Sequence, residues 1–360
     1  MREKVYNIYS DAVKKYYFPR VLEYYEKNYD ILWGQGSNFD KEDAGALLGD
    51  PEGKTCRFCG KSYPEVSFEK DAHVFPRCTG NENLLSAYEC DNCNILFGSI
   101  LEGEYANLFN FCHTIYGVVG RKKIPILQSN DNGSTLKVVN HPEKEGNLHI
   151  VNEGKNSIHT VIDPEKKIFE YEGPGITILP IAVYKCLTKM ALTIMPEAEL
   201  DDFFETLKWV HDKKHEPFFE NKKHLCRYME FYGEYISHPI GFLFKRKPKS
   251  KDGPYMIFMY YYAKMVLMIE IPTKKHIYPY DIKKVQPPFI VGTPFEEKVI
   301  DLSSCEKIRI VPQSRSFTWG AYHDITREAN NILTTNKYAQ LIQREIRMSN
   351  EKRHRKAHDN

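Results

Sequence analysis

Four of the nine cysteines occur as two CxxC pairs whose spacing suits a metal ion. Cys56-Arg-Phe-Cys59 is followed thirty residues later by Cys90-Asp-Asn-Cys93, and Gly60 permits the tight turn that such a pair needs. Four thiolates brought together in this way form the usual tetrahedral ligand set of structural zinc. We therefore expect one zinc ion held by Cys56, Cys59, Cys90 and Cys93. Zinc alone would also fit a ribbon that only stabilises the fold or presents a protein-binding surface.

The residues between and directly after the pairs add polar groups in a defined order. His73 begins the segment His-Val-Phe-Pro, Gly-Asn and Asn-Leu pairs follow at 80–81 and 83–84, and Asn94 comes directly after the second CxxC. This order resembles the HNH endonucleases, in the branch whose two CxxC pairs enclose the active site. There a strand ends in a His followed by two apolar residues and Pro, and the second CxxC is followed by His or Asn. The resemblance covers about fifty of the 360 residues.

The resemblance implies a ββα-metal fold, in which two strands and a helix hold one catalytic divalent ion and the zinc lies to the side. It implies that His73 is the general base, which takes a proton from the water that attacks phosphorus. Asn94 would bind the catalytic ion through its side-chain oxygen, which suits Mg²⁺ or Mn²⁺. The middle Asn of the family holds the loop that orients the base. Asn81 and Asn83 both qualify, and the Gly-Asn pairing favours Asn81.

The chain departs from the family pattern directly before the base. Many HNH enzymes carry Asp, Glu or His there as a second metal ligand, whereas this chain has Ala72. Asp71 lies one position earlier, and a shift of one residue along a strand turns a side chain to the opposite face unless a bulge re-aims it. Glu102 is the other candidate, because eight residues after Asn94 on one helix it would lie about 80° around the axis. Both carboxylates are tentative ligands of the catalytic ion.

The activity implied by the resemblance is metal-dependent endonuclease cleavage of a phosphodiester. The family favours DNA as the substrate, and the residues do not exclude RNA. Residues 180–214 also look like a segment found downstream of this HNH type in bacterial proteins that resemble restriction or antiphage-defence nucleases. The alternative is a non-catalytic module in which zinc builds a nucleic-acid- or protein-binding platform. Either function is compatible with a homo-oligomer or an activating partner.

The pattern of apolar residues predicts an α+β chain divided into four parts. We expect a helical N-terminal region and linker over residues 1–50 and the HNH module over 51–115. A larger α+β domain over 120–348 would recognise the target or regulate cleavage, and it carries no further catalytic motif. Residues 349–360 would form a basic, flexible tail that could contact phosphates.

Periodicity places individual elements within these parts. Residues 3–32 have helical spacing interrupted at Pro19, which predicts two helices, and residues 34–54 are Gly- and Asp-rich as in a linker. Beyond the module, short β-type segments alternate with helices. The predicted helices are 180–195, 197–214 and 324–348, and the predicted strands are 136–139, 148–152, 158–162, 168–171, 240–245, 255–262, 265–271 and 308–311.

Charge and hydropathy bound the partners and the compartment. The net charge is only +2, and residues 1–120 hold 12 basic against 18 acidic residues while residues 121–360 hold 38 against 30. Any general attraction for phosphates must therefore come mainly from the C-terminal two-thirds. The N-terminal residues lack the apolar core of a secretory signal, and the apolar run Tyr255–Ile271 is interrupted by Lys264. We expect a cytoplasmic protein with a nucleic-acid partner and no membrane contact.

Overall fold

The computed structural model describes residues 21, 23–36, 47–120, 123–128, 134–140, 148–154, 159–163, 168–172, 176–232, 235–251, 253–277, 293–310 and 315–318. Helices and strands are mixed along these segments, so the predicted α+β class is confirmed. Among the described helices, none combines the length and the apolar character that crossing a bilayer requires.

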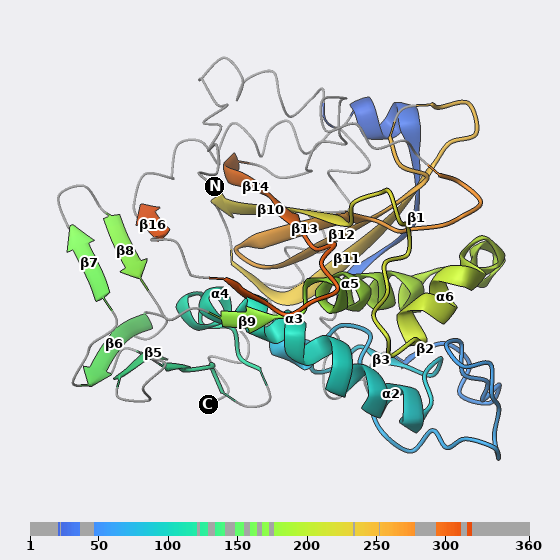
Figure 1. Cartoon of the computed structure of the whole chain (residues 1–360), viewed down its shortest axis with the longest axis horizontal. Helices are drawn as coiled ribbons and strands as arrows, with labels where there is room; N and C mark the ends of the chain where they lie inside the picture. The colour runs from blue at the N-terminus through green and yellow to red at the C-terminus, as the bar shows by residue number, and fades with distance from the viewer. Residues whose placement is uncertain are drawn as a thin grey trace.

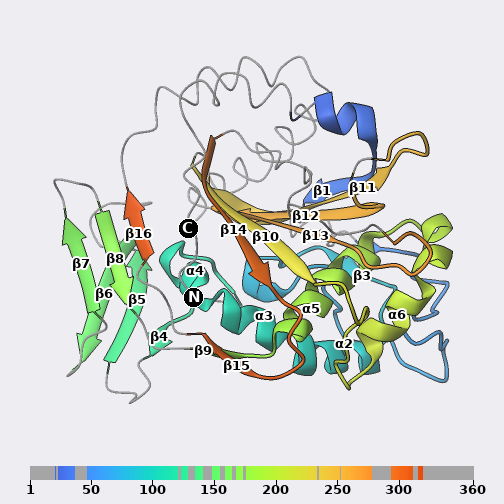
Figure 2. The same ribbon diagram turned by 45° about the horizontal axis from the view of Figure 1, so that its top comes forward.

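A six-stranded antiparallel sheet lies at the centre of the described structure (Figures 1 and 2). Its strands follow the order β1-β11-β12-β13-β10-β14, so a strand that precedes the cysteine pairs lies in the same sheet as five strands that follow them. The bounds are β1 Tyr29–Gly36, β10 Leu225–Tyr232, β11 Ile236–Arg246, β12 Met256–Ala263, β13 Met265–Glu270 and β14 Thr293–Asp301.

Both faces of this sheet are buried, and β12 shows how. Successive side chains of a strand point to opposite faces, so alternate residues enter two different cores. The first core, which also contains the CxxC cysteines and helix α5, takes Met256, Phe258, Tyr260 and Tyr262. The second core takes Ile257, Met259 and Tyr261, together with Tyr25 and Tyr29. The continuous apolar run of β12 is thus the pattern of a strand covered on both sides.

Helix α5 (Pro180–Ile194) lies between the sheet and the helices that follow the second CxxC pair (Figure 2). It packs against β11, against α6 (Phe204–His211), and against η2 (Gly98–Glu102) and α3 (Gly103–Leu108). All of its residues are buried, including Lys185 and Lys189. Pro180 at the first helical position has the fixed φ that suits a helix start.

The CxxC module is built mainly from short elements. A helical stretch runs from α2 (Asp91–Phe97) through the π-helical turn η2 into α3, and α4 (Asn110–Ile115) follows. The other elements are the 3₁₀ turn η1 (Arg77–Thr79) and the strands β2 (Leu47–Leu48) and β3 (Leu85–Ser86), which pair in parallel.

Three smaller sheets complete the described structure. Two are three-stranded, with orders β4-β5-β6 and β16-β8-β7, and the third pairs β15 with β9. The bounds are β4 Leu127–Gln128, β5 Ser134–Asn140, β6 Leu148–Gly154, β7 His159–Asp163, β8 Ile168–Glu172, β9 Ile176–Ile178, β15 Ile308–Ile310 and β16 Arg315–Thr318.

Most predicted elements of the C-terminal part are confirmed. The four strands predicted between residues 136 and 171 appear as β5 to β8, and the strands at 240–245, 255–262, 265–271 and 308–311 appear as β11, β12, β13 and β15. The helix at 180–195 is α5, whereas the helix predicted over 197–214 begins as a 3₁₀ turn, η3 (Glu197–Phe203), before α6. The helix predicted over 324–348 and the basic tail lie outside the described residues.

The prediction for residues 29–36 was wrong. The second N-terminal helix was expected to reach Leu32, but the helical residues end at 28 and β1 follows, so the expected linker does not begin at residue 34. The physical reason is tertiary: β1 pairs with β11 from Tyr29 to Gly36, and the buried Tyr29 hydroxyl donates to the Pro254 carbonyl at 3.0 Å. The first predicted helix lies outside the described residues.

Asp202 ties η3 to the end of the sheet. Its carboxylate accepts hydrogen bonds from the Tyr255 hydroxyl at 3.0 Å and from Lys275 Nζ at 3.0 Å, and His276 Nε2 lies 3.1 Å away. Partial burial acts to raise the pKa of Asp202, but these partners outweigh burial and the pKa is lowered. Folding therefore favours the ionised carboxylate here.

Candidate active site

The four cysteines predicted to bind zinc lie together in space. Their Sγ atoms are all within 4.8 Å of one another, and the Cys56–Cys93 and Cys59–Cys90 sulfur pairs are 3.7 and 3.8 Å apart. A tetrahedral zinc ion with Zn–S bonds of about 2.3 Å would place its sulfur ligands about 3.8 Å apart. The cluster therefore has the ligand type and the dimensions of a structural zinc site.

Local backbone structure places these sulfur atoms. The first pair lies in a turn closed by the Gly60 N–H on the Cys56 carbonyl at 2.8 Å, with Gly60 at a φ of 73° that glycine adopts without strain. In the second pair, Cys90 is the N-cap of α2. The contact between the Cys56 and Cys93 sulfur atoms lowers the pKa of Cys56 to about 4 and raises the pKa of Cys93. Four neighbouring thiolates repel one another, so a bound cation is needed to hold all four ionised.

Asp91, the first residue of α2, holds the loop that leads to His73. Its carboxylate accepts hydrogen bonds from Ser67 Oγ at 2.6 Å and from the main-chain N–H groups of Glu69 at 3.0 Å and Lys70 at 2.8 Å. Burial acts to raise the pKa of Asp91, but these donors outweigh it and the pKa is lowered. The sequence analysis missed this residue, although an Asp in the first turn of a helix is a usable signal.

His73 lies in a short antiparallel pairing. It forms a bridge with Leu85, and main-chain hydrogen bonds of 3.1 and 2.8 Å flank the bridge on its two sides. Residues 72–74 therefore pair with 84–86, and α2 follows directly. This is the strand-strand-helix order that a ββα-metal fold requires.

Phe75 anchors the His73 segment on the six-stranded sheet. Its ring packs on Tyr260 with the ring centroids 4.9 Å apart, and a Cβ added at Gly241 would lie 2.8 Å from its Cζ. The Thr79 hydroxyl lies 2.6 Å from that of Tyr260. The segment that carries His73 is thus built directly on the sheet formed by the rest of the chain.

Asn81 closes the loop between the two paired segments. It is fully buried, its Nδ2 donates to the Phe75 carbonyl at 2.9 Å and to the Leu84 carbonyl at 3.0 Å, and its Oδ1 accepts from the Leu84 N–H at 3.0 Å. One side chain thereby fixes main-chain atoms on both sides of the loop. Asn83, the alternative from the sequence, is also buried.

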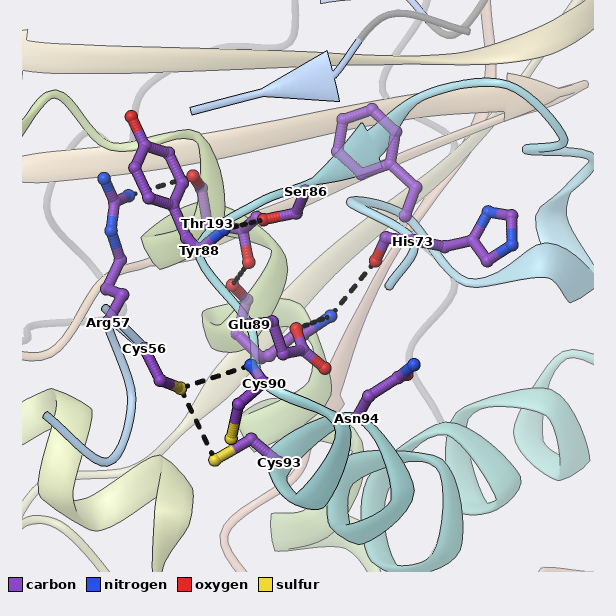
Figure 3. A network of polar contacts seen from close by, with 12 residues as sticks. Cys56, Arg57, His73, Ser86, Tyr88, Glu89, Cys90, Cys93, Asn94 and Thr193 are labelled. Atoms are coloured by element: carbon purple, nitrogen blue, oxygen red, sulfur yellow. Dashed lines mark hydrogen bonds and ion pairs between the residues drawn. The ribbon is translucent and has the colours of Figure 1, made fainter. Parts of the chain in front are cut away.

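Asn94 faces the loop that precedes His73. Its Nδ2 donates to the Asp71 carbonyl at 3.1 Å, so its Oδ1 is the atom left to meet a cation. In Figure 3 the labelled cysteines lie on one side of the first turn of α2, and Asn94 and His73 lie on the other. The Asp71 side chain is exposed, with its main-chain oxygen engaged by Asn94.

The π-helical turn changes where Glu102 lies relative to Asn94. The turn spans Gly98–Glu102, and its i→i+5 hydrogen bonds accommodate one residue more than an α-helical turn. One extra residue sets later side chains back by about 100°, so Glu102 lies about 20° from Asn94 around the axis instead of about 80°. The expectation from regular helix spacing is therefore corrected, and both side chains lie on one face.

A cavity of about 960 Å³ brings most of the predicted catalytic residues together. Its lining includes His73, Asn94, Asp71 and Glu102, whereas Asn81 and the zinc cysteines lie outside it. Three basic side chains also line it, namely Lys70, Arg77 and Lys123. The cavity thus combines an imidazole, three carboxylates (Glu69, Asp71 and Glu102) and an amide with cations that could meet phosphate groups.

Comparison with protein-family models gives a match within the CxxC module. Residues 56–110 match the model of the HNH endonuclease family. Residues 56–110 therefore form an HNH module. No curated protein and no solved structure matches the chain. The family match ends at residue 110, so the larger part of the chain receives no assignment from it.

The HNH module is joined to α5 by side chains from both partners. Arg57, between the first two zinc cysteines, stacks on the Tyr88 ring and donates through Nη1 to the carbonyls of Leu192 at 2.7 Å and of Thr193 and Met195 at 2.9 Å. These carbonyls lie at the C-terminal end of the helix, where intrahelical donors run out, and a guanidinium satisfies such groups well. The Leu192 carbonyl also accepts the Met195 N–H at 3.4 Å. Arg57 therefore fixes the C-terminal end of α5 on the turn that carries Cys56 and Cys59.

Lys189 of α5 makes the second connection to the HNH module. Its Nζ lies 2.8 Å from Glu89 Oε2 and donates to the His73 carbonyl at 3.1 Å. Burial acts to lower the pKa of Lys189, but the carboxylates of Glu89 and Glu102 outweigh burial and the pKa is raised. Arg57 and Lys189 were not found by sequence reasoning, because the residues that they connect between the HNH module and α5 lie about 100 to 140 residues apart.

Proposed function

We propose that the chain is a metal-dependent HNH endonuclease that hydrolyses phosphodiester bonds, with DNA as its substrate. The observation that carries this proposal is the convergence of His73, Asn94 and Glu102 on one cavity beside the four-cysteine cluster. We further propose that residues 120–348 select the target or regulate cleavage. A role in restriction or antiphage defence rests on the resemblance of residues 180–214 alone.

The proposed reaction assigns the proton transfer to His73. Its imidazole would take a proton from a water molecule placed in the cavity for in-line attack on phosphorus. Asn81 would act through the loop, because it holds main-chain atoms on both sides of it. The products would carry 5′-phosphate and 3′-hydroxyl ends.

Asn94 and a carboxylate would hold the catalytic cation. The donor set fits Mg²⁺ or Mn²⁺, since the hydrogen bond from Asn94 Nδ2 turns Oδ1 away from Asp71 O, and carboxylate and amide oxygens are hard ligands. A divalent ion there would neutralise the charge that develops on the phosphate and on the leaving 3′-oxygen. We favour Glu102 over Asp71 as the carboxylate, because the π-helical turn brings Glu102 onto the face of Asn94.

Lys70, Arg77 and Lys123 would position the nucleic-acid backbone. Lys123 reaches the cavity because it forms a bridge with Gly120, which packs on η1: a Cβ added at Gly120 would lie 3.5 Å from Cys78 Cα. Such contacts favour phosphates without reading sequence. Two of the three cations belong to the HNH module itself, although the overall charge had pointed to the C-terminal part.

The second candidate function is a zinc-stabilised platform that binds nucleic acid or protein without cleaving it. Ala72, at the position where many family members carry a metal ligand, is the observation that favours it. An assay with supercoiled plasmid separates the two. We expect Mg²⁺ or Mn²⁺ to convert it to nicked and linear forms, and EDTA to prevent this. Binding without conversion, across double- and single-stranded DNA, phage-modified DNA and RNA, would favour the platform.

Two substitutions decide which carboxylate acts. Glu102→Gln should raise the Mn²⁺ concentration needed for half-maximal cleavage and lower the affinity for Mn²⁺ measured calorimetrically, because it removes a charged ligand. Asp71→Asn is the matched control in the same cavity and should have the smaller effect. The reverse order would assign the role to Asp71. No change in either variant would leave the ion to main-chain or water ligands or to another residue of the cavity, such as Glu69.

A further inference from the structure

Two lysines, one turn apart, lie inside the largely apolar helix α5. Lys185 and Lys189 are both buried, and each donates to a main-chain carbonyl. Lys185 donates at 2.8 Å to the Asp212 carbonyl at the end of α6, and not to the main chain of the HNH module. Lys189 donates to His73 itself. The same type of contact thus serves two different parts of the molecule.

The Lys189 contact is more than neutralisation of a buried charge. The charge of the Lys189 ammonium group could be neutralised by the Glu89 carboxylate alone, which lies 2.8 Å away. An ammonium group has three donors, however. A second donor is directed to the carbonyl of the proposed base, in the contact that Figure 3 marks at the His73 main-chain oxygen. Lys189 is therefore the point at which the buried helix touches the main chain of His73.

The helix that carries Lys189 is itself fixed against the HNH module at both ends. Arg57 binds its last carbonyls, and Glu104 Oε2 accepts the N–H of Leu179 at 2.8 Å, directly before its first turn. With both ends held, α5 has little freedom to slide or rotate against the module. The ammonium group of Lys189 is thereby held at a defined place beside the His73 carbonyl.

We propose that Lys189 is a positioning residue that fixes the His73 main chain, so that α5, which lies outside the family match, is part of the nuclease site. This inference rests on the proposed function of His73. It makes the position of the base depend on α5, because this helix supplies the donor that holds the His73 carbonyl. Misplacing a catalytic group by about 1 Å costs on the order of 10²-fold in rate.

The test separates positioning from charge balance. Lys189→Met with Glu89→Met replaces the buried pair by apolar side chains of similar volume, a change that is often tolerated in folded proteins. Lys185→Met is the matched control, one turn away on the same helix. Zinc content, thermal unfolding, kcat and KM for plasmid nicking are measured for wild type and both variants.

An NMR readout reports on the contact without any catalytic ion. His-Val occurs once in the sequence, at 73–74. Protein labelled with ¹³C′-His and ¹⁵N-Val therefore gives a single carbonyl-to-amide cross-peak from His73. Loss of the Lys189 donor should move this carbonyl resonance upfield in the double variant and leave it unchanged in Lys185→Met.

We expect the double variant to keep its zinc and its KM while kcat falls about 10²-fold. A folded double variant with wild-type kcat, or with an unmoved His73 resonance, would overturn the proposal. Should the double variant unfold, Lys189→Arg is used instead, because it keeps the charge and the donors. A 10²-fold loss of kcat in Lys189→Arg, with the His73 carbonyl resonance unmoved, would contradict the proposal. Failure of the wild-type protein to nick plasmid DNA in any assay would instead refute the nuclease function itself.

Discussion

Replacing Asn81 by Ala should damage both the stability and the activity of the HNH module. The side chain makes three buried hydrogen bonds of 2.9 to 3.0 Å. Of the three main-chain groups involved, the Leu84 carbonyl also accepts from the Val74 N–H at 3.1 Å and keeps that partner. The Leu84 N–H and the Phe75 carbonyl each lose their hydrogen bond to the Asn81 side chain.

Two buried main-chain groups left without these bonds would cost about 1–3 kcal/mol each, so the free energy of unfolding should fall by about 2–6 kcal/mol. The loop that places His73 would also loosen, and kcat should fall on the order of 10²-fold. Denaturant unfolding gives the first quantity. Plasmid nicking in Mn²⁺, measured well below the unfolding temperature, gives the second.

Asn83→Ala is the control for this prediction, because Asn83 is the neighbouring Asn that also fits the sequence motif and is buried. It should retain most of the activity. If Asn81→Ala lost less than about 1 kcal/mol and cleaved at the wild-type rate, the role of Asn81 in holding the loop would be refuted. A larger loss of kcat in Asn83→Ala would transfer that role to Asn83.

Three further outcomes are expected. Cys90→Ser should lose the zinc and unfold the HNH module, since structural zinc contributes on the order of 10 kcal/mol to small metal sites; one zinc per chain in the purified variant, by metal analysis, would contradict this. Gly241→Ala should cost about 1–3 kcal/mol and slow nicking, because the new Cβ would lie 2.8 Å from the Phe75 ring and 3.2 Å from Phe258 Cε2, and adding Phe75→Leu should restore part of the stability. Because the pKa of Asp202 is lowered on folding, its stabilisation is fully present above the unfolded value of about 3.9 and disappears as the pH falls through the lower folded value. The difference in unfolding free energy between wild type and Asp202→Asn, on the order of 1 kcal/mol at pH 7, should therefore vanish in acid, and a difference that persists there would be contrary to this account.

The four-cysteine cluster and the candidates for catalysis could be named from the sequence because they are specified by short sequence intervals. CxxC spacing fixes a pair of thiols in one turn, and the order of His73, Asn81 and Asn94 can be read as a linear motif. The strands β5 to β8 and β11 to β13 were also accessible, since apolar alternation or a continuous apolar run is local information. Helix α5 followed from its length and from Pro180.

What the sequence could not provide depends on contacts between distant segments. β1 has helical spacing in isolation and becomes a strand because β11 offers a partner. The π-helical turn at Gly98–Glu102 cannot be seen in a pattern read at a constant 3.6 residues per turn, and it alone changes the face on which Glu102 lies. A lysine inside an apolar helix, such as Lys189, is visible in the sequence. Its partner is not.

The most direct test of the central claim is the rate of supercoiled-plasmid nicking by wild type and by His73→Ala, measured in Mn²⁺ with zinc content and unfolding temperature matched. The His73 side chain lines the cavity, and the short pairing around His73 is made by main-chain atoms, so its replacement should leave the zinc and the fold intact. Loss of a general base typically lowers the rate on the order of 10²- to 10⁴-fold, and we expect a decrease in that range. Cleavage by folded, zinc-loaded His73→Ala at the wild-type rate would contradict the assignment of this cavity as the nuclease site.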